Sequence, residues 1–115
     1  MTKFVDCDIV VPMASTLSIV AALFIHPGCE VEFAQFETAA ELIMQRYGGR
    51  LERRIGIPPS ADQPHEVHLV TFPDQESFDR YRADADLLAM ADLRARAIRQ
   101  TIAWIGSDFP GFLRK

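Results

Sequence analysis

The sequence is poor in cysteine, in histidine and in excess charge of either sign. Its 115 residues include two cysteines and three histidines, and the net charge is −4. So few cysteines cannot form the disulfide framework of a small secreted domain. An acidic chain also lacks the basic face that nucleic-acid phosphates require. We therefore expect no nucleic-acid partner, and a cytoplasmic protein with free thiols.

Long apolar runs are also missing, which excludes a membrane helix. Residues 1–3 are followed by Asp6 and Asp8, where a signal peptide needs an apolar region. The longest strongly apolar stretch, 17–25, has about half of the ~20 residues that a membrane helix needs. It is rich in β-forming residues and ends at His26-Pro27-Gly28, a turn signal, so it predicts a buried strand.

The remaining patterns alternate between helix and strand. Apolar residues at steps of three and four predict a helix over 30–47 that ends at Gly48-Gly49. Further strands are predicted over 50–57, 65–72 and 101–105, a proline-rich loop over 58–64, and helices after the N-cap Asp74 and over 86–98. This βαββαβ order predicts an α+β, ferredoxin-like fold with one four-stranded antiparallel sheet and helices on one face.

One such domain accounts for residues 16–106. Residues 1–15 form an N-terminal extension, in which 3–11 is a candidate edge strand, and residues 107–115 form a tail that packs on the domain or on a partner. The other face of the sheet is left bare. Because a half-covered apolar sheet needs a partner, we expect a homodimer formed by stacked sheets.

Side-chain alternation along the strands predicts which residues share the bare face. One consistent assignment packs the smaller aliphatic sets against the helices. A mixture of aromatic and ionisable side chains then remains, which is typical of a small-molecule pocket. A register shift of one residue would exchange the two faces. The predicted bare-face set is Ser18, Phe24, Glu52, Arg54, Glu66, His68, Phe72, Gln100 and Trp104.

His68 is the first candidate catalytic residue. It shares a strand face with Glu66, and a carboxylate beside an imidazole is either an acid–base unit or a pair of solvated side chains. Arg54 is the second candidate, because its planar fork stabilises an oxyanion; alternatively, it pairs with Glu52 or Glu66. His65 and His68 point to opposite strand faces, so no metal site is expected.

The other candidates would bind the substrate. Trp104 offers a flat surface for stacking an aromatic ligand, or it belongs to the core of a dimer. Phe24, Phe72, Glu52 and Glu66 complete the predicted substrate-binding set. The sequence has no glycine-rich phosphate loop, because Gly48-Gly49 ends a helix instead of beginning one, and no cofactor is expected.

Three segments resemble a known superfamily. Over residues 16–106 the chain is similar to the dimeric α+β barrel proteins, especially their small bacterial members of unknown function and, more distantly, the antibiotic-biosynthesis monooxygenases. The resemblance implies a homodimer whose two sheets close around a cavity. The matching segments are Leu23-Phe24-Ile25-His26-Pro27-Gly28 with Glu30-Val31-Glu32-Phe33, Tyr47-Gly48-Gly49-Arg50-Leu51, and Val70-Thr71-Phe72-Pro73-Asp74-Gln75-Glu76-Ser77-Phe78.

The superfamily includes oxygenases, isomerases, cyclases and ligand sensors, so three functions stay open. The first is a cofactor-independent enzyme of monooxygenase, isomerase or cyclase type that acts on a small aromatic or polyketide-like molecule. The second is a non-catalytic ligand-binding dimer, and the third is a structural dimer with a filled interior. Haem-degrading members use an asparagine together with tryptophan and histidine, and this chain contains no asparagine.

Overall fold

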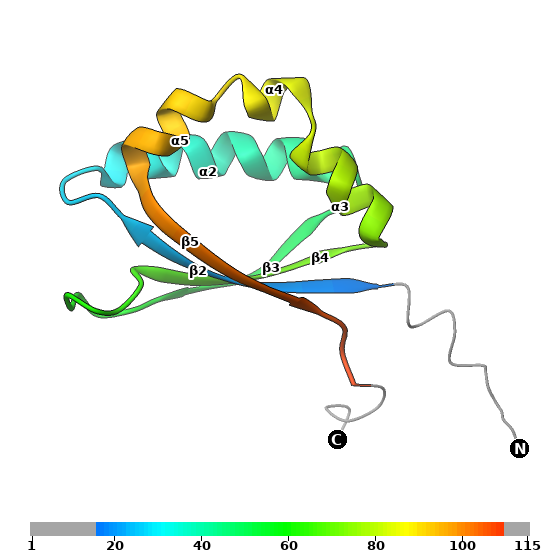
Figure 1. Cartoon of the computed structure of the whole chain (residues 1–115), viewed down its shortest axis with the longest axis horizontal. Helices are drawn as coiled ribbons and strands as arrows, with labels where there is room; N and C mark the ends of the chain where they lie inside the picture. The colour runs from blue at the N-terminus through cyan, green and yellow to red at the C-terminus, as the bar shows by residue number, and fades with distance from the viewer. Residues whose placement is uncertain (1–15, 110–115) are drawn as a thin grey trace, which may run out of the picture.

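The protein is an α+β domain whose helices cover one face of a single sheet (Figure 1). The computed structural model describes residues 16–109, so the predicted edge strand in 1–15 and most of the C-terminal tail lie outside the described residues. The elements in chain order are β2 (Leu17–Ile25), α2 (Glu30–Gln45), β3 (Arg50–Gly56), β4 (Glu66–Phe72), α3 (Gln75–Arg82), α4 (Ala85–Leu88), α5 (Ala91–Ala97) and β5 (Ile98–Gly106).

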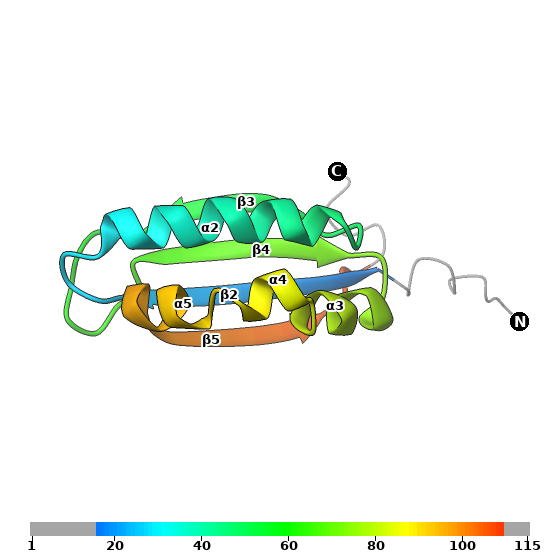
Figure 2. The ribbon, with the colours of Figure 1, turned by 90° about the horizontal axis from the view of Figure 1, so that it is seen from above.

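The sheet has four strands in the order β3-β4-β2-β5, and every neighbouring pair is antiparallel. Seen from above, α2 runs over β3 and β4, while α3, α4 and α5 run over β2 and β5 (Figure 2). The predicted ferredoxin-like fold is confirmed. The helices therefore form two groups over the same face of the sheet (Figure 2).

The largest differences from the predicted boundaries lie in the last helices and the last strand, whereas the earlier elements agree within two residues. The helix expected over 86–98 is two short helices, and the last strand begins at Ile98 instead of residue 101. Ile98 is buried and pairs with Ile25 across β2 and β5. A β-branched residue in that position favours the extended backbone, so the sheet pairing overrides the helical spacing.

The core forms two clusters between the helices and the sheet. One packs Phe33, Phe36 and Ala40 of α2 against Leu23 and Ile25 of β2. The other packs Ile19, Met44, Val70 and Phe72 at the opposite end of α2. The predicted inner face of α2 is therefore confirmed, and Asp74 caps α3 as predicted, accepting a 2.8 Å hydrogen bond from the Ser77 N–H.

The end of α2 depends on two glycines. Gly48 has a φ of 75°, a left-handed conformation that glycine adopts without strain, and the Gly49 N–H donates to the Met44 carbonyl at 3.0 Å. A Cβ at Gly49 would collide with the side chains of Met44 and Phe72. The chain therefore passes close over the core at this position.

Gly49→Ala is expected to lower the free energy of unfolding by about 1–3 kcal/mol, because the added methyl overpacks the second core cluster. Urea unfolding followed by circular dichroism measures the change. Gly56→Ala is the matched control, since nothing lies within 4 Å of a Cβ there. Equal effects of the two substitutions would contradict the close approach at Gly49.

Candidate functional site

The strand register brings Glu66, His68 and Phe72 to the helix-covered face of the sheet. His68 pairs with Ala21, and Phe72 pairs with Leu17. Side chains directly opposite each other on antiparallel strands point to the same face, and Ala21 lines a cavity below the helices. The prediction that these three residues lie on the bare face is therefore wrong.

Arg54 also lies on the helix-covered face, and a β-bulge is the reason. Glu52 and Arg54 are two residues apart and were expected to share a face, but the β3–β4 register shifts between Leu51 and Arg53. Arg54 consequently pairs with His68, whereas Glu52 accepts a 2.8 Å hydrogen bond from the Thr71 hydroxyl. An extra residue in one strand reverses the alternation beyond it.

The remaining predicted residues lie on the bare face as expected. Trp104 pairs with Val20, and Gln100 pairs with Phe24, on the side opposite to the cavity-lining positions of β2. Ser18 pairs with Thr71, whose hydroxyl holds Glu52. The nine residues predicted to form one pocket are thus divided between the two faces of the sheet.

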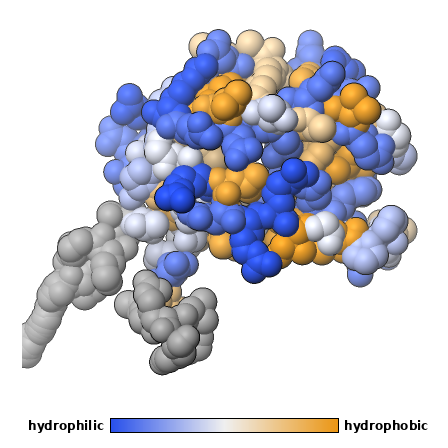
Figure 3. Space-filling model, turned by 180° about the vertical axis from the view of Figure 1, so that it is seen from behind, coloured by the Kyte–Doolittle hydropathy of each residue, from blue (hydrophilic) through white to orange (hydrophobic). Residues whose placement is uncertain are grey.

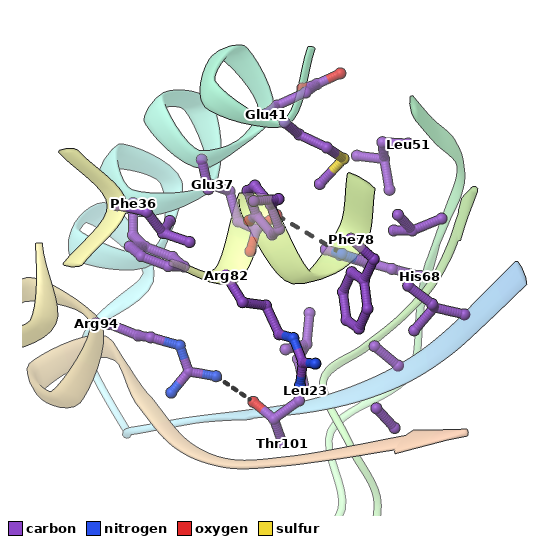
Figure 4. Close-up of a pocket in the computed structure, with 18 of the residues that line it drawn as sticks. Leu23, Phe36, Glu37, Glu41, Leu51, His68, Phe78, Arg82, Arg94 and Thr101 are labelled. Carbon is purple, nitrogen blue, oxygen red and sulfur yellow. Dashed lines mark hydrogen bonds and ion pairs between the residues drawn. The ribbon is translucent and has the colours of Figure 1, made fainter. Parts of the chain in front are cut away.

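A cavity of about 500 Å³ lies between the sheet and the helices, within the size range of small-molecule sites (Figure 4). It occupies the helix-covered side, whereas the sequence placed the pocket on the bare face. Its wall is mostly apolar, with side chains from β2, β4, β5, α2 and the later helices. The polar lining residues are Glu37, Glu41, His68, Tyr81, Arg82, Arg94 and Thr101.

His68 is held at the cavity wall by a chain of charged groups. Its side chain is 5% exposed, and its Nε2 lies 2.8 Å from Glu66 Oε1. Arg54 donates two hydrogen bonds to the same carboxylate, at 3.0 and 2.8 Å. The alternative that Arg54 pairs with Glu66 is therefore confirmed, and Arg54 acts on His68 only through that carboxylate.

This arrangement fixes which imidazole nitrogen is available for proton transfer. Burial alone would raise the pKa of Glu66, but the hydrogen bonds from Arg54 and His68 hold that pKa below its ordinary value. An ionised Glu66 only accepts hydrogen bonds, so His68 Nε2 carries the hydrogen. The Nδ1 atom is left facing Glu37, whose Oε1 lies 3.7 Å away.

Glu37 is a site residue that the sequence analysis missed. Burial, reinforced by the charge of Glu66, raises the pKa of Glu37, and protonation of His68 would oppose this shift. Its position contained a signal, because residue 37 is four after Phe33 and three before Ala40 and so lies on the apolar stripe of α2. A carboxylic acid with a raised pKa beside an imidazole nitrogen forms a pair that can pass one proton between its members.

Tyr81 adds a hydrogen-bond donor to the same cavity. Burial, together with the nearby charge of Glu37, raises the pKa of Tyr81 to about 12. The phenol therefore stays protonated at neutral pH, and its O–H can donate to an oxygen of a bound ligand.

Glu37→Gln is expected to flatten the pH dependence of stability. Because the folded-state pKa of Glu37 lies above its ordinary value, the folded protein binds more protons than the unfolded chain between those two values. The free energy of unfolding of the original protein therefore falls as pH rises through that window, and the glutamine variant loses this decrease.

Urea unfolding of both proteins between about pH 4 and pH 8 measures the difference, which should favour the variant increasingly as pH rises. Glu30→Gln, at an exposed carboxylate of the same helix, is the matched control. If the two substitutions change the pH dependence of the free energy of unfolding equally, Glu37 does not have the raised pKa.

Residues 16–109 contain neither a metal cluster nor a membrane-spanning helix. No group of three or more His, Cys, Asp or Glu side chains in this range is placed to hold a metal ion. None of the helices in the same range is long and apolar enough to cross a membrane.

No protein-family model and no curated protein matches the sequence, but solved structures share its fold. SnoaB, a cofactor-independent oxygenase from Streptomyces nogalater, is 16% identical, with a TM-score of 0.66 over 87% of this chain and 99% of SnoaB. RPA0582, a protein of unknown function from Rhodopseudomonas palustris, is 12% identical, with a TM-score of 0.71 over 84% of each chain.

A third similar structure is a DABB family protein with a ferredoxin-like fold from Mesorhizobium loti. It is 15% identical, with a TM-score of 0.62 over 83% of this chain and 98% of that protein. Identities this low establish the fold alone. The resemblance to the dimeric α+β barrel proteins is thus confirmed at the level of the fold.

Proposed function

We propose that the protein is a cofactor-independent oxygenase that acts on a small, electron-rich aromatic molecule bound between the sheet and the helices. The observation that carries this proposal is the pairing of Glu37 with His68 at the wall of an otherwise apolar cavity of about 500 Å³. SnoaB, which shares this fold, is a cofactor-independent oxygenase. Apolar walls with a few convergent polar groups are typical of small-molecule sites.

The chemistry begins with removal of a proton from the ligand. His68 Nδ1 accepts the proton, while Glu66 and Arg54 hold the imidazole from its other side. The resulting carbanion supplies the electrons that reduce O₂. When a methylene carbon is oxidised to a carbonyl, one oxygen atom enters the product and the other leaves as water. Without O₂ consumption, the same first step would begin an isomerisation or cyclisation.

An anthrone, a fused-ring aromatic with an acidic methylene group, tests this proposal. We expect the purified protein, with a chelator present, to accelerate conversion of the anthrone to the quinone, with one O₂ consumed for each molecule. Labelled ¹⁸O₂ should place one label in the product carbonyl. Tight binding of the probe without O₂ uptake would overturn the oxygenase proposal and favour a non-catalytic ligand-binding protein.

We also propose that a second copy of this chain covers the bare face of the sheet. This face exposes Val20, Ile55, Ile102 and Trp104, and Trp104 is directly opposite Val20 in the register. In Figure 3 apolar side chains reach the lower border of the molecule, the side on which the sheet lies in Figure 1. Copies that meet through this face form a self-complementary interface with two-fold symmetry.

A further inference from the structure

Arg94, on α5, is a cation at the cavity that the proposed proton transfer does not use. It lines the cavity and donates a 3.0 Å hydrogen bond to the Thr101 hydroxyl. Its guanidinium carbon lies 6.0 Å from the centre of the Phe36 ring. A β5 hydroxyl and an α2 ring thus hold the guanidinium in position, which lowers the entropy lost when it binds a ligand.

The charge of Arg94 has no counterion within residues 16–109. No carboxylate of this range forms a salt bridge with Arg94, whereas Arg82, the other arginine at the cavity, pairs with Asp79 at 2.6 Å. Arg94 is exposed, and an exposed arginine without a carboxylate is ordinary on a solvated surface. Here, however, the guanidinium borders a mostly apolar cavity, where it favours an anionic ligand group more strongly than it would in bulk water.

The side of the cavity near His68 carries acidic side chains instead. Glu37 and Glu41 line the cavity from α2, and Figure 4 shows the Glu37–His68 contact on a different side of the cavity from the Arg94–Thr101 hydrogen bond. A ligand with an anionic end would be repelled by the carboxylates of α2 and attracted by Arg94. The charge distribution therefore favours one orientation of such a ligand.

We propose that the natural ligand carries an oxyanion of the carboxylate class. Arg94 binds this group through its planar guanidinium, while the apolar part of the ligand extends toward His68. This inference rests on the proposed cavity function and adds the chemical class of the substrate to it. Arg94 selects and orients the ligand, and His68 reacts with it. The preferred substrate is then an aromatic acid, and a neutral aromatic such as the anthrone binds less tightly.

A matched pair of fluorescent probes tests the inference on the full chain. The probes are 1-anilinonaphthalene-8-sulfonate and N-phenyl-1-naphthylamine, which share one ring system and differ in the sulfonate. We expect the protein to bind the sulfonate probe at least about tenfold more tightly than the neutral probe, which is the size of a charge-assisted hydrogen bond. Arg94→Gln should remove this preference without changing the affinity for the neutral probe.

Arg96→Gln is the control, because Arg96 is exposed on the same helix and does not line the cavity. It should leave both affinities unchanged. If the protein binds the neutral probe but shows no preference for the sulfonate, or if Arg94→Gln and Arg96→Gln weaken sulfonate binding equally, the anion inference fails and the proposed cavity function remains. If neither probe binds, both proposals fail.

Discussion

Turnover of an anthrone is expected to fall by about 100- to 10,000-fold when His68 is replaced by glutamine, the range typical for loss of a general base. Glutamine keeps an N–H donor for Glu66 but has no basic nitrogen to face the cavity. Binding of the neutral naphthylamine probe should remain nearly unchanged, because the variant keeps the apolar walls. Initial rates of O₂ uptake and fluorescence titrations measure the two effects separately.

His65→Gln is the matched control for this substitution. His65 lies outside the cavity lining, and its Nδ1 accepts a 3.1 Å hydrogen bond from the Ile25 N–H, which a glutamine carbonyl can also accept. This variant should retain full turnover. Full turnover in the His68 variant would show that another group, with Glu37 the nearest alternative, removes the proton, and a parallel loss of probe binding would make His68 a structural residue.

The fold was predictable because each element has a strong local signal. Residues 17–25 form a short β-rich run that a Pro-Gly turn ends, and α2 shows a clear three- and four-residue period. The start of β5 is the exception. The helix predicted over 86–98 includes Ile98, yet Ile98 pairs with Ile25 in the sheet, and only the partner strand reveals this.

The site was only partly predictable, because two of its features run against the usual patterns. Alternation assigned the polar set of β4 to the bare face, but Glu66 and His68 satisfy each other on the core side with Arg54 as a third member. The bulge in β3 also has no clear mark in the sequence. Glu37, by contrast, was recognisable as a carboxylate within the apolar stripe of a helix, which is the kind of local conflict that functional sites produce.

Trp104→Lys is expected to convert the protein from a dimer to a monomer at micromolar concentration. Trp104 is 59% exposed on the bare face, on the edge strand β5 and directly opposite Val20 of β2. A tryptophan buried in an interface often dominates its energy, and a lysine in its place would add an unpaired buried charge. We expect the dissociation constant of the dimer to rise about 1,000-fold or more.

Size-exclusion chromatography with light scattering measures the masses. Leu42→Lys is the matched control, because Leu42 is 62% exposed but lies on the outer surface of α2, away from the sheet. A monomeric original protein, or dissociation by Leu42→Lys instead of Trp104→Lys, would contradict the proposed interface.

The same variant distinguishes two locations for the ligand. The cavity below the helices is formed by residues of one chain, so the monomeric Trp104→Lys variant should still bind the neutral naphthylamine probe with nearly the original affinity. A chamber enclosed between two sheets, as the sequence alone suggested, would disappear with the dimer. Loss of probe binding in step with dissociation would therefore move the site to the bare face and remove His68 and Glu37 from it.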